Sequence, residues 1–527
     1  MICVSFKTST KKIHLLGNIP EELSISLKNL GYRSVPRSKE LCCSHDIYLS
    51  TKHLLGKVFE NKETIEFFNS LKSLEEKNNS IIQNYLDKKL GPFKLFPYQE
   101  EFVRFYNDPL EAPHAVFNAS SPGLGKTTMA LSAIFVTKPN CPLIILCPKN
   151  AVGVWKWHLE KFNYSLPIYT EFKPGKCACI CTYDSIPPKI EEALGNKKPL
   201  KDFKSDICKE TVLISDEFHL VKNAKAIRTL RFRELFKYVR DKDGKCIALT
   251  GTPVLNKCVE FKVLLDNLDL FKKTFGNASN FYKLFGGEFN PYLRRIVWDE
   301  SKRNPEEIKE RVKQVLFIRK KEEVLEQIPD KVNTVIPVEI TKKSIIKDLD
   351  SLNEKFKKHK DKLSAMTKTD ISHYTLLREV LSSLKLKILT EKVEYFEEVE
   401  KPIIVFSDFV SPVKELAKRQ GWACICGDTS AKERTKLEKD FNSGKLKGLA
   451  ITIRAGGTAL SLTNTDTMLF LDLNLTPGLN IQAKNRIDRV SKINKSLTYL
   501  YFMSNHIFEK EMHDMLIRKE RLVDDVI

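Results

Sequence analysis

Residues 115–136 read AVFNASSPGLGKTTMALSAIFV. The stretch begins as a short apolar run, passes through a glycine-containing turn, and continues with the spacing of a helix. A glycine-rich loop between a buried strand and a helix is the setting of a P-loop, in which backbone amides surround phosphate oxygens. The stretch therefore predicts a nucleotide-phosphate site at the end of a buried strand.

The side chains of this loop suit that chemistry. Gly123 and Gly125 let the backbone turn its amides inward, and Lys126 brings a positive charge to the β- and γ-phosphates. The Thr127 hydroxyl is a hard oxygen ligand of the kind that Mg²⁺ prefers. Thr128 follows in the first turn of the helix, whose N-terminus favours anions. We therefore expect ATP and Mg²⁺ to bind here.

The loop departs from the pattern G-x-x-x-x-G-K-T at one position, where Ser120 replaces the first glycine. The alternative interpretation is a glycine-rich turn with a chance lysine. The strand before the loop and the helix after it favour the P-loop.

Acidic side chains follow a second apolar run in TVLISDEFH, residues 211–219. Asp216 is expected to hold Mg²⁺ through water, and Glu217 to orient the attacking water as a general base. His219 is expected to connect this strand with the next motif. An Asp-Glu pair at a strand end can instead cap a helix, but the apolar strand before it favours the nucleotide site.

Short apolar runs recur in two series along the chain. The runs lie at 115–120, 142–148, 176–184, 211–217 and 246–252, and then at 402–409, 423–428, 448–457, 467–473 and 497–504. Such runs indicate strands buried on both faces of a parallel sheet, with helices between them. Two consecutive series predict an α/β protein with two doubly wound lobes of the RecA-like P-loop type.

Four segments follow from this pattern. We expect a small appended domain at 1–85 with a helix at 65–86, a first RecA-like lobe at 86–270, a helical linker or protrusion at 271–315, and a second lobe at 316–527. The second lobe carries a helical insertion at about 342–398, rich in Lys and Glu. We expect this insertion to be an exposed helical hairpin whose charge reflects a solvated face.

The composition of the chain favours some partners over others. The 527 residues carry a formal net charge of +20, which favours a nucleic-acid partner, although genome composition explains such an excess about as well. No run of about 18 apolar residues predicts a membrane span, and the N-terminus does not resemble a signal peptide. We expect an intracellular, soluble protein, without distinguishing nucleus, cytoplasm or a viral replication site.

Thirteen cysteines are present, and none form a C-x-x-C pair. Cys177, Cys179 and Cys181 alternate, which places them on one face of a strand. Buried thiols pack as small hydrophobic groups, so we interpret these three as core residues and not as metal ligands. A large lysine-rich chain of this kind indicates a reducing compartment.

The motifs, taken in chain order, resemble those of superfamily 2 helicases and, within them, the Swi/Snf-type ATPases closest to the HARP or annealing-helicase DNA translocases. The resemblance covers about 90–512. It rests on FPYQEEFV (96–103), LIILCPKNAVGVWKWHLEKF (143–162), CTYDSI (181–186), DEFHLVKNAKA (216–226), LTGTPVLN (249–256), FIRKKEEVLEQIPDK (317–331), CGDTSAKERTKLEKDFN (426–442), ITIRAGGTALSLT (451–463) and QAKNRIDRV (482–490).

This resemblance implies roles for individual residues. Gln99 would read the adenine edge, and Thr250, Gly251 and Thr252 would sense hydrolysis and couple it to movement of nucleic acid. The residues that it places at the nucleic acid are Pro148, Lys149, Thr182, Arg454 and Gly456. Phe218 and Ala459 depart from the family pattern, as does Val490-Ser-Lys after the last motif.

The last motif has a direct physical interpretation. Gln482, Arg486 and Arg489 are three or four residues apart, so they would share one helix face. Two such arginines reach a γ-phosphate only if the second lobe closes on the first, and an arginine supplied across a cleft can accelerate hydrolysis by several orders of magnitude. A surface salt-bridge ladder is the alternative, which the accompanying motifs disfavour.

Three functions are compatible with these patterns. The resemblance implies a monomeric, DNA-stimulated ATPase that translocates on double-stranded DNA in replication, repair, recombination or transcription. A second hypothesis is a helicase that separates DNA or RNA strands; this needs a wedge or pin, and only an aromatic hairpin near Phe285 or Trp298 offers a candidate. A third is a nucleic-acid-binding scaffold with a decayed ATP site, supported only by Ser120 and Ala459.

Overall fold

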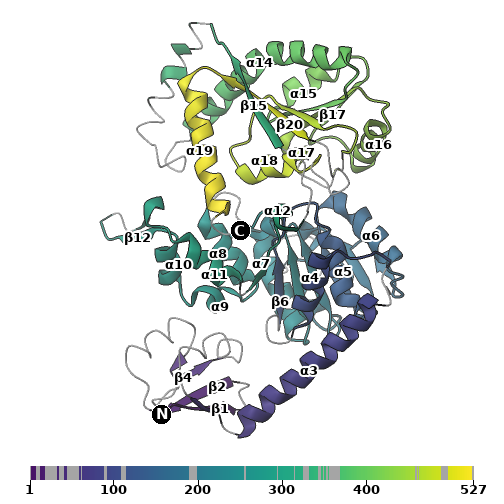
Figure 1. Cartoon of the computed structure of the whole chain (residues 1–527), viewed down its shortest axis with the longest axis vertical. Coiled ribbons are helices and arrows are strands. Elements are labelled where there is room, and N and C mark those ends of the chain that lie inside the picture. Colours follow the sequence, from purple (N-terminus) through teal and green to yellow (C-terminus); the bar gives the residue numbers. More distant parts are fainter. Residues whose placement is uncertain are drawn as a thin grey trace. The chain divides into compact units, whose positions relative to one another are not determined.

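The chain folds into α/β units and is shown as a computed structural model in Figure 1. It divides into two compact units, one made mainly of the residues up to Lys320 and the other mainly of Lys321–Leu522. Within the described residues, no helix is long and apolar enough to cross a membrane. The structure describes residues 2–7, 12–17, 33–34, 41–43, 58–60, 62–87, 92–108, 114–188, 199–253, 257–292, 295–313, 315–324, 331–341, 343, 346–347, 349–351, 354, 368–456, 460, 462–487 and 496–524.

The N-terminal segment contains a small sheet followed by a long helix. Its strands are β1 (Ile2–Lys7), β2 (Lys12–Gly17), β3 (Arg33–Ser34), β4 (Leu41–Cys43) and β5 (Val58–Glu60), in the order β3-β4-β2-β1-β5. All neighbours are antiparallel except β1 and β5. Helix α3 (Lys62–Asp87) confirms the helix predicted at 65–86.

The first lobe is a seven-stranded, wholly parallel sheet in the order β14-β6-β11-β10-β7-β9-β8. Its strands are β6 (Ala115–Asn118), β7 (Leu143–Leu146), β8 (Ile168–Tyr169), β9 (Ala178–Cys181), β10 (Val212–Asp216), β11 (Lys245–Leu249) and β14 (Leu316–Phe317). Its helices are α4 (Pro97–Asn107), α5 (Lys126–Phe135), α6 (Val152–Lys161) and α7 (Ile227–Arg240), with short 3₁₀ turns η2 (Lys149–Ala151), η3 (Tyr183–Ser185), η5 (Leu200–Phe203) and η6 (Phe218–Val221).

Burial explains why these sequences form central strands. Nearly every residue of β6, β7, β9, β10 and β11 is buried, as expected for a parallel sheet covered on both faces. Cys177, Cys179 and Cys181 are all buried, as predicted for core thiols. The predicted boundary at 315/316 moves, because Leu316 and Phe317 pair with β6 and so extend the first sheet.

A helical subdomain follows the first sheet in the chain. It contains α8 (Cys258–Asn267), α9 (Phe271–Phe275), α10 (Ala278–Leu284), η7 (Glu300–Lys302) and α11 (Pro305–Lys313). Its core is aromatic, with ring centroids of Phe275, Phe281 and Phe285 between 4.5 and 6.0 Å apart. The sequence pattern indicates helices here, with an aromatic hairpin near Phe285 or Trp298 only as a possibility under the strand-separation hypothesis. The structure has an antiparallel hairpin of β12 (Gly287–Asn290) and β13 (Arg295–Trp298), whereas Phe285 is buried in the aromatic core.

The second lobe is a six-stranded parallel sheet in the order β15-β20-β19-β16-β18-β17. Its strands are β15 (Lys331–Val338), β16 (Ile403–Ser407), β17 (Trp422–Ile425), β18 (Gly448–Thr452), β19 (Thr467–Phe470) and β20 (Leu497–Ser504). Its helices are α12 (Lys321–Val324), α14 (Lys368–Glu398), α15 (Val410–Leu416), α16 (Ala431–Asn442), α17 (Ile453–Gly456), α18 (Pro477–Lys484) and α19 (Ile507–Asp524).

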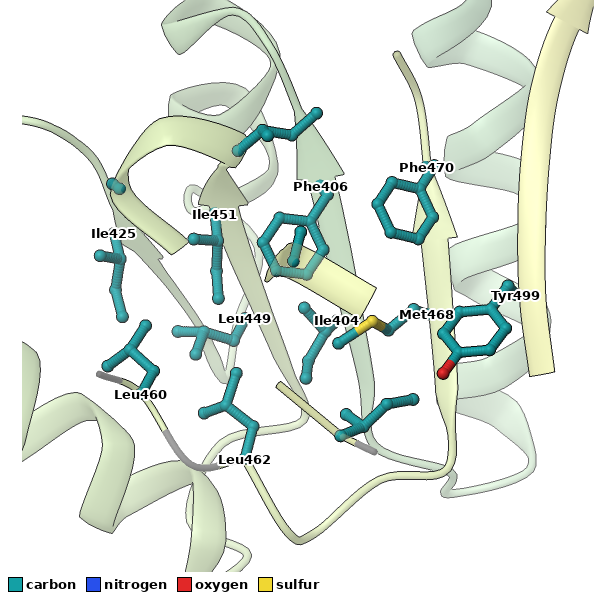
Figure 2. Close-up of a cluster of buried hydrophobic side chains, with 14 of the residues drawn as sticks. Ile404, Phe406, Ile425, Leu449, Ile451, Leu460, Leu462, Met468, Phe470 and Tyr499 are labelled. Carbon is teal, nitrogen blue, oxygen red and sulfur yellow. The ribbon is translucent and has the colours of Figure 1, made fainter. Parts of the chain in front are cut away.

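Apolar side chains from neighbouring strands meet on one face of this sheet. Figure 2 shows Ile404 and Phe406 of β16 beside Met468 and Phe470 of β19, and all four are buried. The rings of Phe406 and Phe470 stack with centroids 5.5 Å apart. Full burial of an aliphatic or aromatic side chain contributes about 1.5–3 kcal/mol, so this cluster supplies much of the stability of the lobe.

Helix α14 corrects the prediction that 342–398 is exposed. It buries Leu377, Leu381 and Leu389 against the lobe, and its charged side chains Arg378 and Lys385 are buried as well. The sequence could not distinguish a buried lysine from a solvated one in a stretch so rich in charge. The charged run EKFKKHKDKL lies almost wholly outside the described residues.

Lys385 is neutralised by two buried carboxylates. Its Nζ lies 2.5 Å from Glu509 Oε1 and 3.3 Å from Asp472 Oδ1, and it donates to the Phe502 carbonyl at 3.1 Å. Ser382 and Ser407 each donate to Asp472 Oδ2 at 2.6 Å. Burial alone would lower the pKa of Lys385, but the two carboxylates outweigh it and raise that pKa above its ordinary value.

Replacing Lys385 by alanine should therefore destabilise the second lobe strongly. The variant would leave the Asp472 and Glu509 carboxylates buried without their cation, at a cost of about 3–5 kcal/mol. Thermal unfolding of wild type and variant measures the loss. Lys387→Ala, at an exposed position two residues away on α14, should change stability by less than about 0.5 kcal/mol. Equal melting of the two variants would contradict the network's role.

Candidate nucleotide site

The sheet of the first lobe brings the predicted residues to one edge. The P-loop follows β6, Thr250 follows β11, and Asp216 ends β10. Pro148 and Lys149 follow β7, and Thr182 follows β9. These five strands are adjacent and parallel, so their carboxyl ends meet at the edge where α/β proteins bind ligands.

The P-loop has the backbone that a phosphate cradle requires. Gly123 and Gly125 adopt φ of +86° and +78°, the left-handed region that favours glycine. Gln99 Nε2 lies 2.7 Å from the position that a Cβ on Gly125 would take. Gln99 Oε1 also accepts from the Phe96 amide at 3.0 Å, which fixes the side chain at the start of α4. Gln99, predicted to read adenine, is thus packed against the phosphate loop.

Ser120 has a structural reason to replace glycine. Its hydroxyl accepts from the Arg319 amide at 3.1 Å, and its own amide donates to Asn118 Oδ1 at 3.0 Å. The Ser121 amide donates in turn to the Arg319 carbonyl at 2.9 Å. The side chain that departs from the usual pattern therefore ties the P-loop to the segment after β14, and does not by itself indicate a decayed site.

Lys126 and Arg319 both make hydrogen bonds to the backbone of the P-loop. The Lys126 ammonium donates to the Ser120 carbonyl at 2.8 Å and to the Ser121 carbonyl at 3.1 Å. The Arg319 guanidinium pairs with Glu101 of α4 at 2.6 Å and lies over the Phe317 ring. Because Arg319 is anchored in this way, its backbone holds the P-loop from one side.

Asp216 is held by three donors. Trp155 Nε1 donates to its Oδ2 at 3.0 Å, and the Glu217 amide donates to its Oδ1 at 3.0 Å. The Tyr183 hydroxyl donates to the Asp216 carbonyl at 2.7 Å. Trp155 and Tyr183 belong to motifs of the sequence resemblance, but we predicted no role for either. A fixed position in a family motif was the only signal, since neither has acid–base chemistry of its own.

A chain of side chains joins the ends of β10 and β11. His219 Nδ1 lies 3.3 Å from Glu217 Oε2 and 3.0 Å from Thr250 Oγ1. The Thr252 amide donates to Thr250 Oγ1 at 3.2 Å. Glu217 adopts φ of +49°, a strained conformation for a side-chain-bearing residue of the kind that collects at functional sites. His219 therefore contacts a residue of each motif, and its role in coupling them stays a prediction.

Burial sets the charge states of these groups. Burial and the neighbouring Glu217 raise the pKa of Asp216 to about 6, against the opposing effects of Trp155 and Lys126. Burial and Lys222 lower the pKa of His219 to about 4, so the imidazole is neutral near pH 7. A buried carboxylate whose charge is costly, at the same sheet edge as the P-loop threonine Thr127, is a donor set that fits a divalent cation, because the cation would favour the ionised form.

The second-lobe residues are placed by β18 and α18. Gln482 is buried on α18, but this helix ends at Lys484 and Arg486 lies in the following turn. Arg486 is also buried, and its Nη1 donates to the Leu460 carbonyl at 3.3 Å. The helix face predicted for Gln482, Arg486 and Arg489 is thus interrupted, because the backbone leaves the helix at Asn485. Arg489 lies outside the described residues.

The remaining predicted residues fall into two classes. Thr127, Thr128 and Gly251 are partly buried at the site edge. Arg454 is exposed on α17, whereas Gly456 is buried, and a Cβ there would lie 2.5 Å from the Phe406 ring. Gly456 therefore permits close packing of α17 on the sheet. Ala459 lies outside the described residues.

Comparison with known families agrees with this arrangement. A model described as "SNF2-related domain" matches residues 98–393, more than half of the chain, and "Helicase conserved C-terminal domain" matches 384–491. The chain belongs to the SNF2-related family. The predicted resemblance to Swi/Snf-type superfamily 2 proteins is thereby confirmed, as is the α/β fold class, which the two parallel sheets show directly.

Several relatives are similar over most of the chain. The DNA annealing helicase and endonuclease ZRANB3 of Bos taurus is 26% identical over 467 residues, which are 84% of this chain and 41% of that protein. The SWI/SNF-related matrix-associated actin-dependent regulator of chromatin subfamily A-like protein 1 homolog of Caenorhabditis elegans is 26% identical over 81% of this chain and 61% of its own length. The chain thus spans about half the length of these relatives.

A solved structure also aligns with this SNF2-related chain. The Sulfolobus solfataricus SWI2/SNF2 ATPase core in complex with dsDNA covers 82% of the chain at 20% identity, with a TM-score of 0.35. The fold assignment therefore rests on the sheets described above.

The raised pKa of Asp216 predicts a pH-dependent stability. Its folded-state pKa of about 6 exceeds the ordinary 3.8, so the stability linked to its protonation is present at low pH and is lost as the pH rises through 6. Between pH 7.5 and 5.5, wild type should gain about 1 kcal/mol relative to Asp216→Asn. Melting curves of both proteins across this range measure the gain.

An exposed aspartate of the same lobe provides the control for this titration. Asp202→Asn, in η5, should melt in parallel with wild type at every pH. Parallel curves for Asp216→Asn as well would show that the Asp216 carboxyl does not titrate near pH 6.

Proposed function

We propose that this SNF2-related chain hydrolyses ATP with Mg²⁺ and uses the energy to translocate along double-stranded DNA. The observation that carries the proposal is the convergence of Lys126, Asp216–Glu217 and the His219–Thr250 pair on one sheet edge. A phosphate loop, an acidic pair and a relay to the next motif are the parts that a phosphoryl-transfer site needs.

Each site residue of the first lobe would have a separate role in ATP binding or hydrolysis. The P-loop amides and Lys126 would bind the phosphates, and Gln99 would contact the base. Mg²⁺, held by Thr127 and Asp216, would neutralise charge on the phosphate oxygens. Glu217 would orient the attacking water and accept its proton. Trp155 and Tyr183 position Asp216 but touch no substrate.

Coupling to movement would pass through His219 and Thr250. A neutral His219 between Glu217 and Thr250 can respond to the charge on Glu217 by changing its hydrogen bonds. Thr250 continues directly into Gly251 and Thr252, to which the motif resemblance assigns the coupling of hydrolysis to movement of the nucleic acid. Loss of the γ-phosphate would thus alter the hydrogen bonds of His219 and Thr250, and through them the position of the adjoining residues that are proposed to move the nucleic acid.

The second lobe would contribute Gln482, Arg486 and Arg489. Arginines supplied from another lobe stabilise charge on the transferred phosphoryl group only when the lobes close. Hydrolysis would therefore be limited to the closed state, and repeated closure would move the lobes along the nucleic acid.

Duplex DNA is the proposed track. The net charge of +20 suits a phosphate-directed contact that requires no base readout. Relatives described as DNA annealing helicase and as chromodomain-helicase-DNA-binding protein 1-like support DNA as the nucleic acid. Lys149, Thr182 and Arg454 are the proposed contacts, with partners among replication, repair, recombination or transcription proteins.

The test is ATPase activity of the full chain with different nucleic acids. Duplex DNA should stimulate turnover at least about tenfold more than single-stranded DNA or RNA of equal length, and added salt should weaken stimulation steeply. Lys126→Ala and Glu217→Gln should each reduce turnover at least about 100-fold, because one loses phosphate charge and the other the base.

Two controls separate the alternatives in this assay. Lys156→Ala, at an exposed position on α6, should retain wild-type turnover. Equal or stronger stimulation by RNA would exclude the duplex translocase. Absence of turnover by the wild-type chain would indicate the decayed scaffold, which a loss of turnover in Lys126→Ala would eliminate.

A further inference from the structure

The β12–β13 hairpin projects from the helical subdomain as a narrow two-stranded ribbon (Figure 1). Gly287 pairs with Trp298 and Phe289 with Ile296, so these four residues share one face of the ribbon. Pro291 and Tyr292 follow β12 at the tip. The ribbon therefore presents an aromatic face and an aromatic tip.

Contacts at the base of the hairpin hold it in place. The Asp299 amide donates to the Gly286 carbonyl at 2.7 Å, and Lys302 pairs with Glu288 at 3.1 Å. Trp298 packs edge-on against Tyr282 of α10 with ring centroids 5.8 Å apart. A Cβ on Gly287 would lie 2.7 Å from the Trp298 ring, so glycine lets that ring cover the backbone. Trp298 is thus the anchor of the ribbon.

The outer part of the hairpin leaves large apolar side chains in solvent. Phe289 is 63% exposed and Tyr292 95% exposed, the highest value among the large hydrophobic residues of the described chain. Val297, on the opposite face, is 41% exposed. Exposed aromatic side chains on a projecting, anchored element indicate a binding function more often than isolated surface residues do.

We propose that Phe289 and Tyr292 stack on unpaired bases where a DNA duplex branches into single strands. This inference rests on the proposed function and adds to it a preference for DNA junctions. A translocase that tracks along phosphates has no other means, among the residues assigned above, of distinguishing a continuous duplex from a branch point.

The size of the hairpin favours a base over a protein surface. A stable protein interface buries about 800 Å² on each partner, which two strands of four residues cannot supply. A base needs only one ring face, and stacking of a base on an aromatic side chain is favourable for every base type. One or two exposed rings therefore suffice to hold an unpaired base.

The positive charge of the sequence around the hairpin also favours a nucleic-acid partner over a protein surface. Residues 271–313 contain ten Lys or Arg and six Asp or Glu, a net charge of +4. Within the hairpin stretch 287–298, two arginines stand beside Tyr292 in the sequence against a single glutamate. Aromatic side chains interleaved with basic ones are the composition of surfaces that hold unpaired bases next to a phosphate backbone.

The experiment compares the full chain on two DNAs of equal length, a blunt duplex and a fork with 2-aminopurine as its first unpaired base. Wild type should bind the fork about tenfold more tightly than the blunt duplex and should change the 2-aminopurine fluorescence on binding. The double variant Phe289→Leu/Tyr292→Leu keeps the apolar character but removes the rings. It should lose the fork preference and the fluorescence change.

Two controls show whether the rings act by stacking. Phe289→Tyr/Tyr292→Phe retains both rings and should retain the fork preference. Tyr395→Leu removes an exposed ring of α14 in the second lobe and should bind both DNAs as wild type does. ATPase stimulation by the blunt duplex should stay within about twofold of wild type in all three variants.

The outcomes separate this inference from the proposed function. No stimulation of wild-type ATPase by either DNA would refute the proposed translocase itself. Stimulation without a fork preference in wild type, or a preference that survives in the leucine double variant, would overturn the stacking role. Equal loss of binding to fork and blunt duplex in that variant would also overturn it, since the hairpin would then be a general DNA contact.

Discussion

Parallel pairing of β6, β11, β10, β7 and β9 is the constraint on which the rest of the structure depends. Parallel strands end at a common edge, and here that edge receives the P-loop, Asp216 and Thr250 from three separate segments of the chain. The hydrogen bonds of Trp155 and Tyr183 to Asp216 then fix the acidic group within a frame that the sheet has already set. The strand ends thus set where the site residues lie, and the helix and turn that carry Trp155 and Tyr183 add hydrogen bonds to Asp216.

In each lobe, buried carboxylates lie at the carboxyl-end edge of the parallel sheet, but their charges are compensated differently in the two lobes. In the first lobe, Asp216 stays buried beside Glu217 with a raised pKa, an electrostatic cost that a bound cation would relieve. In the second lobe, Ser407 and Asp472 follow or end adjacent strands, and Lys385 of α14 already supplies the cation. The first edge is therefore prepared for a ligand, whereas the second is satisfied internally and serves as scaffold.

Much of the fold and of the first-lobe site could be predicted from the sequence. Buried parallel strands read as continuous apolar runs, so all ten strands of the two series were found, and the P-loop and acidic pair have strict local patterns. Strand β15 has no continuous apolar run because most of its residues are exposed, so the same pattern does not predict it. The burial of Lys385 and Arg378 depends on contacts more than 80 residues away, such as Glu509 and Leu473, which no local pattern contains. The roles of Trp155, Tyr183 and Ser120 depend on tertiary hydrogen bonds in the same way.

The central claim is that hydrolysis needs residues from both lobes, and separate measurement of nucleotide binding and single-turnover hydrolysis tests it most directly. With duplex DNA present, Arg489→Ala and Arg486→Gln should bind ATP within about threefold of wild type, since in the proposed site Lys126 and the P-loop would hold the phosphates. Hydrolysis of the bound ATP should fall at least about 100-fold, with wild-type melting behaviour showing that the second lobe is folded. Hydrolysis at the wild-type rate in either folded variant would contradict the account.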